Sequence, residues 1–355
     1  MLQEIIKKVK NKERITQDEA LKLYDLELLE LGELAGSIRE EKFGKKSYFN
    51  INRHINPTNI CKDTCKFCAY SATRKNPNPY AMSEQEIVNI AKEAYSKGAK
   101  EVHIVSAHNP EVGLDWYVKS FAKVKEALPD IHIKALTAAE INFLSEEYNK
   151  SYEEIIDLMI SNGVDSMPGG GAEIFDEEVR DRICKGKVSS KNWLKIHEIW
   201  HSRGKMSNAT MLFGHIESRA NRIDHMNRLR ELQDKTGGFN AFIPLVYQRE
   251  NNYLKVEKFL SANEILKTYA IARIFLDNFP HIKAYWATST INLALLAQEF
   301  GCDDLDGTIQ KESIQSAAGA NSANGMDLEE FVGLIKNSGF IPVERDSLYN
   351  ELKVW

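Results

Sequence analysis

The sequence NICKDTCKFCAY at residues 59–70 carries Cys61, Cys65 and Cys68 at the spacing C-x3-C-x2-C. Three thiolates so close in sequence can converge on one metal centre from a single tight loop. Thiolate sulfur is a soft ligand that selects iron–sulfur clusters, zinc or copper. The preceding segment, YFNINRHINP at residues 48–57, alternates like a β-strand. The sequence therefore predicts a metal-binding loop placed directly after a strand.

The number of thiols in this loop separates two kinds of metal site. The next cysteine, Cys184, lies far along the chain. A structural zinc site normally closes with a fourth ligand, whereas three thiolates on a four-iron cluster leave one iron open. The motif resembles that of the radical S-adenosylmethionine (SAM) superfamily, and Phe67 before the last cysteine belongs to the resemblance. It implies a [4Fe-4S] cluster and SAM, with cofactor contacts from Phe67 and Tyr70. The alternative is a non-catalytic zinc protein whose loop is completed by His54 or Cys184.

Composition places the chain among ordinary globular enzymes. It has 355 residues, of which 43% are hydrophobic and 27% charged, with a formal net charge of −5. Nothing in this balance favours nucleic acid or an anionic membrane as a partner, and no apolar run is long enough to span a bilayer. Five cysteines, three of them clustered, do not suggest a disulfide framework. We expect a reduced, cytoplasmic protein that acts on small molecules.

The rest of the chain alternates between strand and helix patterns. Thr16 opens a capping box for an N-terminal packing helix, in which apolar residues recur at helical spacing. Strands are expected at residues 47–57, 101–107, 131–136, 163–171, 205–213, 239–246 and 282–287 and near Leu305, with helices between them. About eight such units predict an α/β fold, a (β/α)8 TIM-type barrel. We expect a helical extension at residues 1–46 and one barrel domain with C-terminal helices at residues 47–355.

In such a barrel the site lies at the carboxyl ends of the strands. The second strand ends at Ser106, where radical SAM enzymes hold the SAM amino group. The fourth ends at MPGGGAE, where glycines let the backbone approach a ligand closely. Glu173, the acid after these glycines, is a candidate for hydrogen bonds to the SAM ribose, as acids are in nucleotide sites. Arg180 could bind the SAM carboxylate in a bidentate fork.

The fifth predicted strand, SNATMLF, leads into GHIE. Asn208 and Thr210 alternate with apolar residues, so one polar face could line the barrel interior and contact substrate. His215 follows at the strand end with Glu217 close by. We predict that His215 transfers a proton or anchors the substrate.

Five segments taken together narrow the resemblance. HINPTNICKDTCKFCAY, MPGGGAEIF, SNATMLFGHIE, HMNRLRELQDKTGGFNAFIPL and AAGANSANGM are similar to the aminodeoxyfutalosine synthase family of the futalosine route to menaquinone. The resemblance covers residues 51–343. It implies that the 5′-deoxyadenosyl radical adds to 3-[(1-carboxyvinyl)oxy]benzoate, which rearranges and loses bicarbonate to give 6-amino-6-deoxyfutalosine. It also implies an electron donor of the flavodoxin or ferredoxin type. Dehypoxanthine futalosine cyclase and the deazaflavin-core synthase subunit share these elements and remain alternatives.

The implied substrate carries two carboxylates on a flat ring, so its pocket needs cations and an apolar or aromatic wall. Further candidates follow the sixth and seventh strands, namely Arg249, Tyr285, Ser289 and Asn292.

The first strand offers two more candidates, Arg53 and His54. Neighbouring side chains on a strand face opposite ways. Asn52, His54 and Asn56 form a uniformly polar set. We therefore expect His54 and Asn56 to point into the barrel and to contact substrate, with His54 in a catalytic role. Arg53 should extend outward among the helices.

Overall fold

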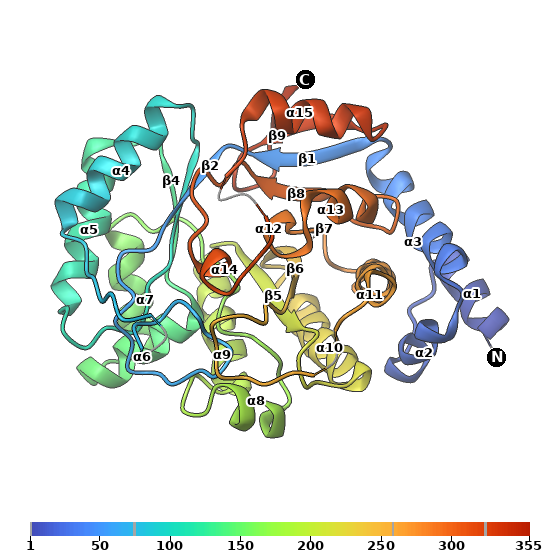
Figure 1. The fold of residues 1–355 in the computed structure, drawn as a ribbon, viewed down its shortest axis with the longest axis horizontal. Coiled ribbons are helices and arrows are strands. Elements are labelled where there is room, and N and C mark those ends of the chain that lie inside the picture. The colour runs from blue at the N-terminus through green and yellow to red at the C-terminus, as the bar shows by residue number, and fades with distance from the viewer. Residues whose placement is uncertain (1, 74–75, 258, 323–324) are drawn as a thin grey trace.

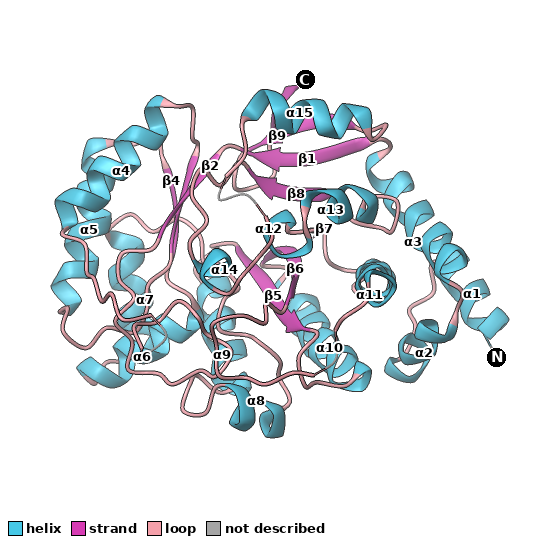
Figure 2. Cartoon of the chain, in the orientation of Figure 1, coloured by secondary structure: helices cyan, strands magenta, loops and turns pink. Residues whose placement is uncertain are grey.

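The protein is an α/β fold in which strands occupy the centre and helices the outside (Figures 1 and 2). The computed structural model describes residues 2–73, 76–257, 259–322 and 325–355. The gap at 323–324 falls inside AAGANSANGM. The strands are β1 (Lys46–Asn50), β2 (Asn52–Ile55), β3 (Glu101–Ile104), β4 (His132–Ala135), β5 (Ser207–Phe213), β6 (Phe239–Val246), β7 (His281–Ile282), β8 (Asp304–Gly307), β9 (Ile341–Arg345) and β10 (Glu351–Val354).

Helices separate most of the successive strands. They are α1 (Leu2–Lys10), α2 (Gln17–Lys22), the 3-10 turn η1 (Leu23–Asp25), α3 (Leu28–Phe43), α4 (Glu84–Ser96), α5 (Leu114–Ala127), α6 (Ala138–Tyr148), α7 (Tyr152–Ser161), α8 (Glu177–Ile183), α9 (Ser190–Ser202), α10 (Arg219–Thr236), α11 (Ala262–Phe275), α12 (Trp286–Ser289), α13 (Ile291–Ala297), α14 (Ile314–Ala317) and α15 (Leu328–Asn337). No helix in the described ranges is long and apolar enough to cross a membrane.

Parallel pairing connects the central strands. One group runs in the order β2-β3-β4 and another in the order β5-β6-β7. Isolated parallel bridges link residues 134 and 166, 167 and 207, and 283 and 304, so segments between the groups are also hydrogen-bonded. β1, one residue before β2, pairs in parallel with β8 and β9. Because these strands run the same way, their carboxyl ends and the loops that follow come together on one side.

Two predicted strands differ from the structure. The segment at 163–171 makes only the isolated bridges of Ser166 and Met167, because Pro168 lacks an N–H and three glycines follow. The strand expected at 282–287 ends after Ile282, and Trp286 already begins α12. β9 and β10 were not predicted from the sequence. They extend the sheet beyond β1 and form an antiparallel pair.

The N-terminal helices pack against the outer helices α10 and α11. Thr16 forms the expected capping box with Glu19. The single long helix predicted after it is interrupted, since the backbone at Leu26 is extended before α3 begins. α3 packs on α11 and α2 packs on α10, which is also the side of the molecule where Figure 1 places the N-terminus.

Local capping sets where many of the outer helices begin. Ser83, Thr137 and Ser151 each accept a hydrogen bond from the glutamate three residues on and bind that glutamate's carboxylate in return. The apolar faces of these helices then cover a core built on strand residues such as Val102 and Ile133, both fully buried. The fold leaves one side of this core open at the strand ends.

Candidate active site

A cavity of about 300 Å³ lies at the carboxyl ends of the parallel strands. Its wall includes most of the side chains that the sequence singled out. These are His54, Asn56, Cys61, Cys65, Phe67, Cys68, Tyr70, Ser106, Glu173, Asn208 and Thr210. The structure therefore brings together, from β2, β5 and three loops, residues that are up to about 150 positions apart in the chain. This volume is within the usual range for small-molecule and cofactor sites.

The cysteine loop is held from both sides by backbone hydrogen bonds. Lys66 donates its N–H to the carbonyl of Ile183 at 2.7 Å, and Leu254 donates to the carbonyl of Lys66 at 2.8 Å. Ser71 donates its backbone N–H to Cys68 Sγ at 3.4 Å, an interaction of the kind that tunes iron–sulfur clusters. The loop is thus fixed by the end of α8 and by the segment after β6.

Three free thiols face this cavity, whereas Cys184 and Cys302 are buried and do not line it. Among the described residues, the sulfur atoms of the three loop cysteines do not fall within 4.8 Å of one another as the ligands of a single ion would. Zinc–sulfur bonds of about 2.3 Å require such closeness. Three soft thiolate donors on one wall are the donor set that a four-iron cluster with one open iron requires.

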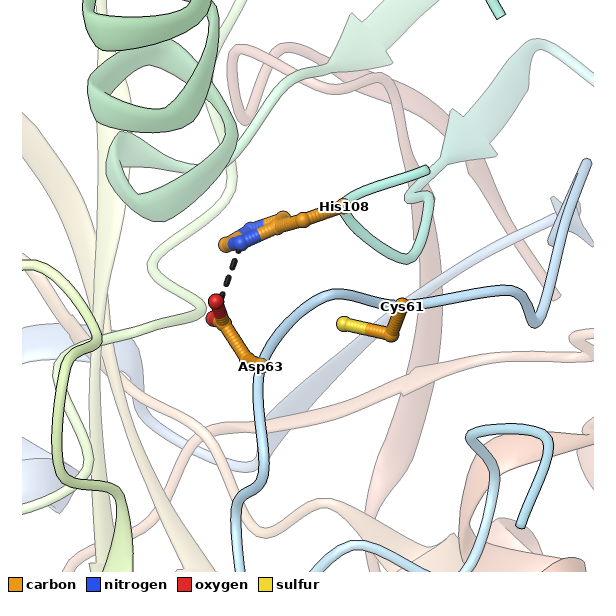
Figure 3. A group of neighbouring side chains, drawn as sticks. All are labelled: Cys61, Asp63 and His108. Carbon is orange, nitrogen blue, oxygen red and sulfur yellow. Dashed lines mark ion pairs between the residues drawn. The ribbon is translucent and has the colours of Figure 1, made fainter. Parts of the chain in front are cut away.

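An ion pair ties the cysteine loop to the turn after β3 (Figure 3). His108 Nδ1 lies 2.9 Å from Asp63 Oδ2, and Lys62 donates its backbone N–H to the carbonyl of His108 at 3.0 Å. The His108 ring stacks flat on Phe143 at 5.2 Å. Figure 3 shows Cys61 beside this pair, and ligand atoms of the three residues lie within 4.8 Å of one another. Neither His54 nor Cys184, the expected fourth zinc ligands, belongs to this group.

The predicted orientation of the first strand is confirmed. His54 and Asn56 line the cavity and Arg53 does not. Tyr70 stands beside Asn56, because its hydroxyl donates to the Asn56 carbonyl at 3.2 Å. At the end of β3, Ser106 lines the cavity and donates its backbone N–H to Glu140 Oε1 at 2.8 Å.

The glycines of the MPGGGAE loop serve protein packing as well as the cavity. A Cβ at Gly169 would lie 2.7 Å from the backbone of Ala209 and Thr210 on β5. Gly171 has a φ of +85°, and a Cβ there would lie 2.7 Å from Ala139. Close approach of the backbone is thus needed against neighbouring strands and helices, in addition to any ligand. Glu173 follows with a φ of 47°, a conformation rare outside glycine, and reaches the cavity.

Lys187, which the sequence analysis did not single out, lies beside Glu173 at the cavity wall. Lys187 Nζ lies 2.7 Å from Glu173 Oε1 and 5.6 Å from the centre of the Phe67 ring. Burial opposes the charge on Lys187, but the Glu173 carboxylate outweighs it and holds the lysine pKa well above its usual value. The cavity therefore contains an ion pair directly beside the cysteine loop.

Arg180 lies outside the cavity lining. Its guanidinium donates to the carbonyls of Ala172 at 2.5 Å and Ile174 at 3.0 Å, and also to those of Gly171 and Val188. These carbonyls surround the glycine loop, so Arg180 holds that loop in shape. Its two terminal nitrogens are each already shared between two acceptors, and nothing in its placement supports the expected contact with a SAM carboxylate.

Three further predicted residues lie behind the cavity wall. His215 Nε2 is 3.1 Å from the carbonyl of Leu212, and Nδ1 is 3.2 Å from Glu217. Arg249 donates to the Val256 carbonyl, and Ser289 Oγ donates to the Tyr285 carbonyl at 3.0 Å. In each case a residue near them in sequence lines the cavity, namely Leu212, Gln248 and Tyr285. In these three segments the residue that lines the cavity is therefore one or a few positions before the predicted residue in the sequence.

The sequence analysis did not predict two ion pairs between side chains that line the cavity. Lys134 Nζ lies 2.5 Å from Glu101 Oε2, and Lys283 pairs with Asp306. Burial opposes ionisation of Glu101, yet Lys134 holds its pKa well below the usual value. The available signal was a single charge within an otherwise apolar strand, as in EVHI and IHIKA.

Comparison with solved structures identifies the class of fold. The chain superposes on methylornithine synthase with a TM-score of 0.77 at 18% identity, covering 95% of this chain and 97% of that one. The FeFe-hydrogenase maturase HydG from Carboxydothermus hydrogenoformans gives a TM-score of 0.74 at 18% identity, covering 98% and 80%. Residues 55–229 match the family model of the radical SAM superfamily, and residues 236–354 match the CofH/MqnC C-terminal region.

Sequence relatives of known activity are similar over almost the whole chain. An aminodeoxyfutalosine synthase of Thermus thermophilus is 42% identical, covering 99% of this chain and 96% of the relative. One of Streptomyces coelicolor is 38% identical, covering 99% and 94%. A cyclic dehypoxanthine futalosine synthase of Streptomyces coelicolor is 36% identical, covering 99% and 89%. The chain belongs to the radical SAM superfamily and, within it, to the family of the aminodeoxyfutalosine synthases. The resemblance drawn from the sequence motifs is confirmed.

Proposed function

We propose that the protein is a radical SAM transferase that makes 6-amino-6-deoxyfutalosine from SAM and 3-[(1-carboxyvinyl)oxy]benzoate for menaquinone biosynthesis. The observation that carries the proposal is the meeting of three free thiols with Phe67 and Glu173 at one cavity. The full-length similarity to aminodeoxyfutalosine synthases supports it and exceeds the similarity to the cyclic dehypoxanthine futalosine synthase.

Cys61, Cys65 and Cys68 would hold a [4Fe-4S] cluster. When bound, the cluster and SAM supply a 5′-deoxyadenosyl radical that adds to the enol-ether double bond of the substrate. Phe67 offers a ring face to the adenine, and Glu173 offers a carboxylate to the ribose hydroxyls. Their assignment rests on their position in the cavity next to the cysteine loop. Ser106 and Tyr70 complete the cofactor side, and Asn56 would contact the substrate.

We propose Lys187 rather than Arg180 as the cation beside SAM, because Lys187 lines the cavity and Arg180 is occupied by carbonyls. Lys187 also neutralises Glu173 in the absence of ligand, which limits the cost of burying that carboxylate.

The substrate pocket lies on the β5 and β6 side. Leu212, Ile243 and Leu245 give it an apolar wall for the aromatic ring. Asn208 lines this part of the cavity, whereas the Thr210 hydroxyl already donates to the Gly169 carbonyl at 2.6 Å. Enclosure of the ring by this wall keeps water away from the radical.

We further propose that the strands form a closed (β/α)8 barrel at residues 47–355, preceded by the helical extension at residues 1–46. The isolated bridges between the two parallel groups and the pairing of β1 with β8 support closure. An electron donor of the flavodoxin or ferredoxin type would reduce the cluster.

The test is anaerobic incubation of the reconstituted protein with SAM, dithionite and 3-[(1-carboxyvinyl)oxy]benzoate, followed by mass spectrometry. A product with the mass of 6-amino-6-deoxyfutalosine supports the proposal. Free 5′-deoxyadenosine formed only with dehypoxanthine futalosine as substrate would instead identify a cyclase. Protein that binds zinc and no iron would exclude both.

A further inference from the structure

Two histidines face each other across neighbouring strands in the interior of the cavity. His54 on β2 and His103 on β3 are register partners, and both line the cavity. His54 Nε2 lies 3.3 Å from His103 Nδ1, and the rings meet edge to face with centres 4.6 Å apart. Lys134 is the register partner of His103 on the next strand. A row of three basic side chains therefore crosses β2, β3 and β4.

The lysines of the cavity wall do not provide a spare positive charge. Each lies against a carboxylate in the structure. The pairs are Lys134 with Glu101 at 2.5 Å, Lys187 with Glu173 at 2.7 Å, and Lys283 with Asp306. His108 is likewise paired with Asp63 at 2.9 Å.

The two facing histidines differ from these pairs. The nearest carboxylate of His54 is Asp306 at 3.9 Å, and Asp306 already binds Lys283. Among the described residues, His103 Nε2 has no hydrogen-bond partner. Of the described basic groups on the wall, the His54–His103 pair is thus the one that is not already committed to a carboxylate.

The proposed substrate brings two negative charges into this cavity. SAM carries a net charge of +1, but a four-iron cluster with three thiolate ligands is net negative, so SAM does not neutralise both substrate carboxylates. A substrate carboxylate would meet lysines that are already paired, and a buried charge without a partner is costly. A proton taken up with the substrate would supply positive charge at this place.

We propose that His54 and His103 form the subsite for the benzoate carboxylate of the substrate, and that the pair takes up one proton when the substrate binds. The inference rests on the proposed function, since that function supplies the dicarboxylate. The benzoate carboxylate is assigned because β2 runs toward the cysteine loop and His54 precedes Cys61 by seven positions. The histidines therefore lie deeper than the cluster, away from the double bond that reacts there.

The proton taken up on binding can be assigned to particular ring nitrogens of the pair. A neutral pair shares one N–H between the facing nitrogens, which leaves a hydrogen on only one of the two outer nitrogens. Protonation places an N–H on both, His54 Nδ1 and His103 Nε2, so that the pair becomes a cation. His103 Nε2 is buried, so His54 Nδ1 would be the donor to the carboxylate, and charge-assisted hydrogen bonds of this kind are among the stronger ones in proteins.

Burial keeps the pair neutral before substrate arrives. Burial lowers the pKa of His54, and burial followed by the nearby His54 lowers that of His103 to about 3. The titratable and charged groups that line the cavity on the surrounding strands and loops are Glu101, Lys134, Lys283, Tyr285, Asp306 and Glu312. The carboxylates among them favour protonation and the lysines oppose it, so an added substrate carboxylate shifts the balance toward the protonated pair.

The experiment is calorimetric titration of substrate into holoenzyme saturated with SAM, without reductant, so that no turnover occurs. Binding enthalpies in phosphate and in Tris at pH 7 give the number of protons taken up. We expect about one proton per substrate, and an affinity that falls about tenfold for each unit of rising pH. The methyl ester of the benzoate carboxylate should bind without taking up a proton.

Two variants each replace one imidazole ring by an amide. The amide can keep the hydrogen bond to the remaining histidine, but it cannot take up a proton. His54→Gln retains an amide near the Nε2 position, and His103→Asn retains one near Nδ1. Both should bind substrate at least tenfold more weakly at pH 7 and take up no proton. His132→Gln is the matched control, because His132 lies on β4 outside the cavity and its Nε2 bonds Ser166 Oγ at 2.7 Å. It should take up the same proton as the unmodified enzyme, and unchanged melting temperatures confirm that all three variants fold.

Proton uptake that persists in both histidine variants, or that the methyl ester also shows, would overturn the inference. So would the absence of uptake in the unmodified enzyme. The outcome is separable from that of the proposed function, because product formation is measured independently. An enzyme that makes 6-amino-6-deoxyfutalosine but binds its substrate without a proton would retain the function and refute the subsite.

Discussion

Cys61, Cys65 and Cys68 differ from the other two cysteines in where their side chains lie. The three line the cavity and are partly exposed, whereas Cys184 and Cys302 are buried in the apolar core. A cluster that loses one of three ligands has no spare thiol on the cavity wall to replace it.

We expect Cys61→Ala, Cys65→Ala and Cys68→Ala each to abolish the stable cluster and all cleavage of SAM. Cys184→Ala and Cys302→Ala are the controls and should retain iron near the unmodified level. Iron and sulfide analysis after anaerobic reconstitution provides the measurement. Loss of iron in Cys184→Ala comparable to the loop variants would show that the cluster has four cysteine ligands.

Glu173 is the acid best placed to contact SAM. It reaches the cavity in a left-handed backbone conformation and is balanced by Lys187 at 2.7 Å. Glu173→Gln should weaken SAM binding by about ten- to a hundredfold, since a hydrogen bond to a charged group contributes roughly 1.5–3 kcal/mol. Calorimetric titration of SAM into holoenzyme measures the change.

Glu178→Gln is the matched control for this prediction, because Glu178 is an exposed acid on α8, five residues away. It should bind SAM as the unmodified protein does. Equal SAM affinity in both variants would remove Glu173 from the cofactor site.

At the scale of elements, the MPGGGAE loop depends on its close contact with β5. A side chain at Gly169 would collide with backbone atoms of Ala209 and Thr210, which cannot move without shifting the strand. Gly169→Ala should therefore lower the free energy of unfolding by about 1–3 kcal/mol, the usual cost of overpacking. Urea denaturation monitored by circular dichroism measures it.

Gly333→Ala is the corresponding control in an open position. Gly333 lies within α15, and a Cβ added there would have no neighbouring atom of the described residues within 4 Å. Alanine there should raise the free energy of unfolding by about 0.5–1 kcal/mol, because glycine is a poor helix former. A Gly169→Ala protein as stable as the Gly333→Ala protein would show that β5 yields more readily than its packing indicates.

At the scale of the whole molecule, several histidines are buried in neutral form. His225 Nε2 donates to the Thr210 carbonyl at 2.9 Å, and its ring stacks on Phe175 at 3.9 Å. Burial lowers its pKa to about 3. In the unfolded chain the same histidine titrates near 6.5, so acid favours the unfolded state between these two values.

This difference predicts the pH dependence of stability. As pH falls below 6.5 the unfolded chain binds a proton at residue 225 that the folded protein does not, so stability is lost between 6.5 and about 3. His225→Gln, which retains a donor for Thr210, should lose about 2 kcal/mol less than the unmodified protein when pH falls from 7 to 5. Urea titrations at the two pH values measure the difference. An identical loss in both proteins would mean that His225 binds its proton equally well in the folded and the unfolded chain.

The alternation of strands and helices, the capping boxes and the cysteine loop could all be predicted from the sequence. Each depends on neighbours in the chain, as Thr16 with Glu19 and the three cysteines of one loop show. The superfamily followed from the spacing of those cysteines together with Phe67. The alternation of polar residues on the first strand also predicted correctly that His54 and Asn56 face the cavity and Arg53 does not.

Only the tertiary structure decided which distant charges meet. Lys187 faces Glu173 and Lys134 faces Glu101 because separate elements pack together, and no local pattern records those partners. The same holds for Arg180, whose nearest acceptors are carbonyls of the loop it supports. Periodicity reports whether a side chain is buried, whereas its partner depends on strand register and on the paths of loops far apart in sequence. The register of β2 with β3, which brings His54 against His103, was decided in this way.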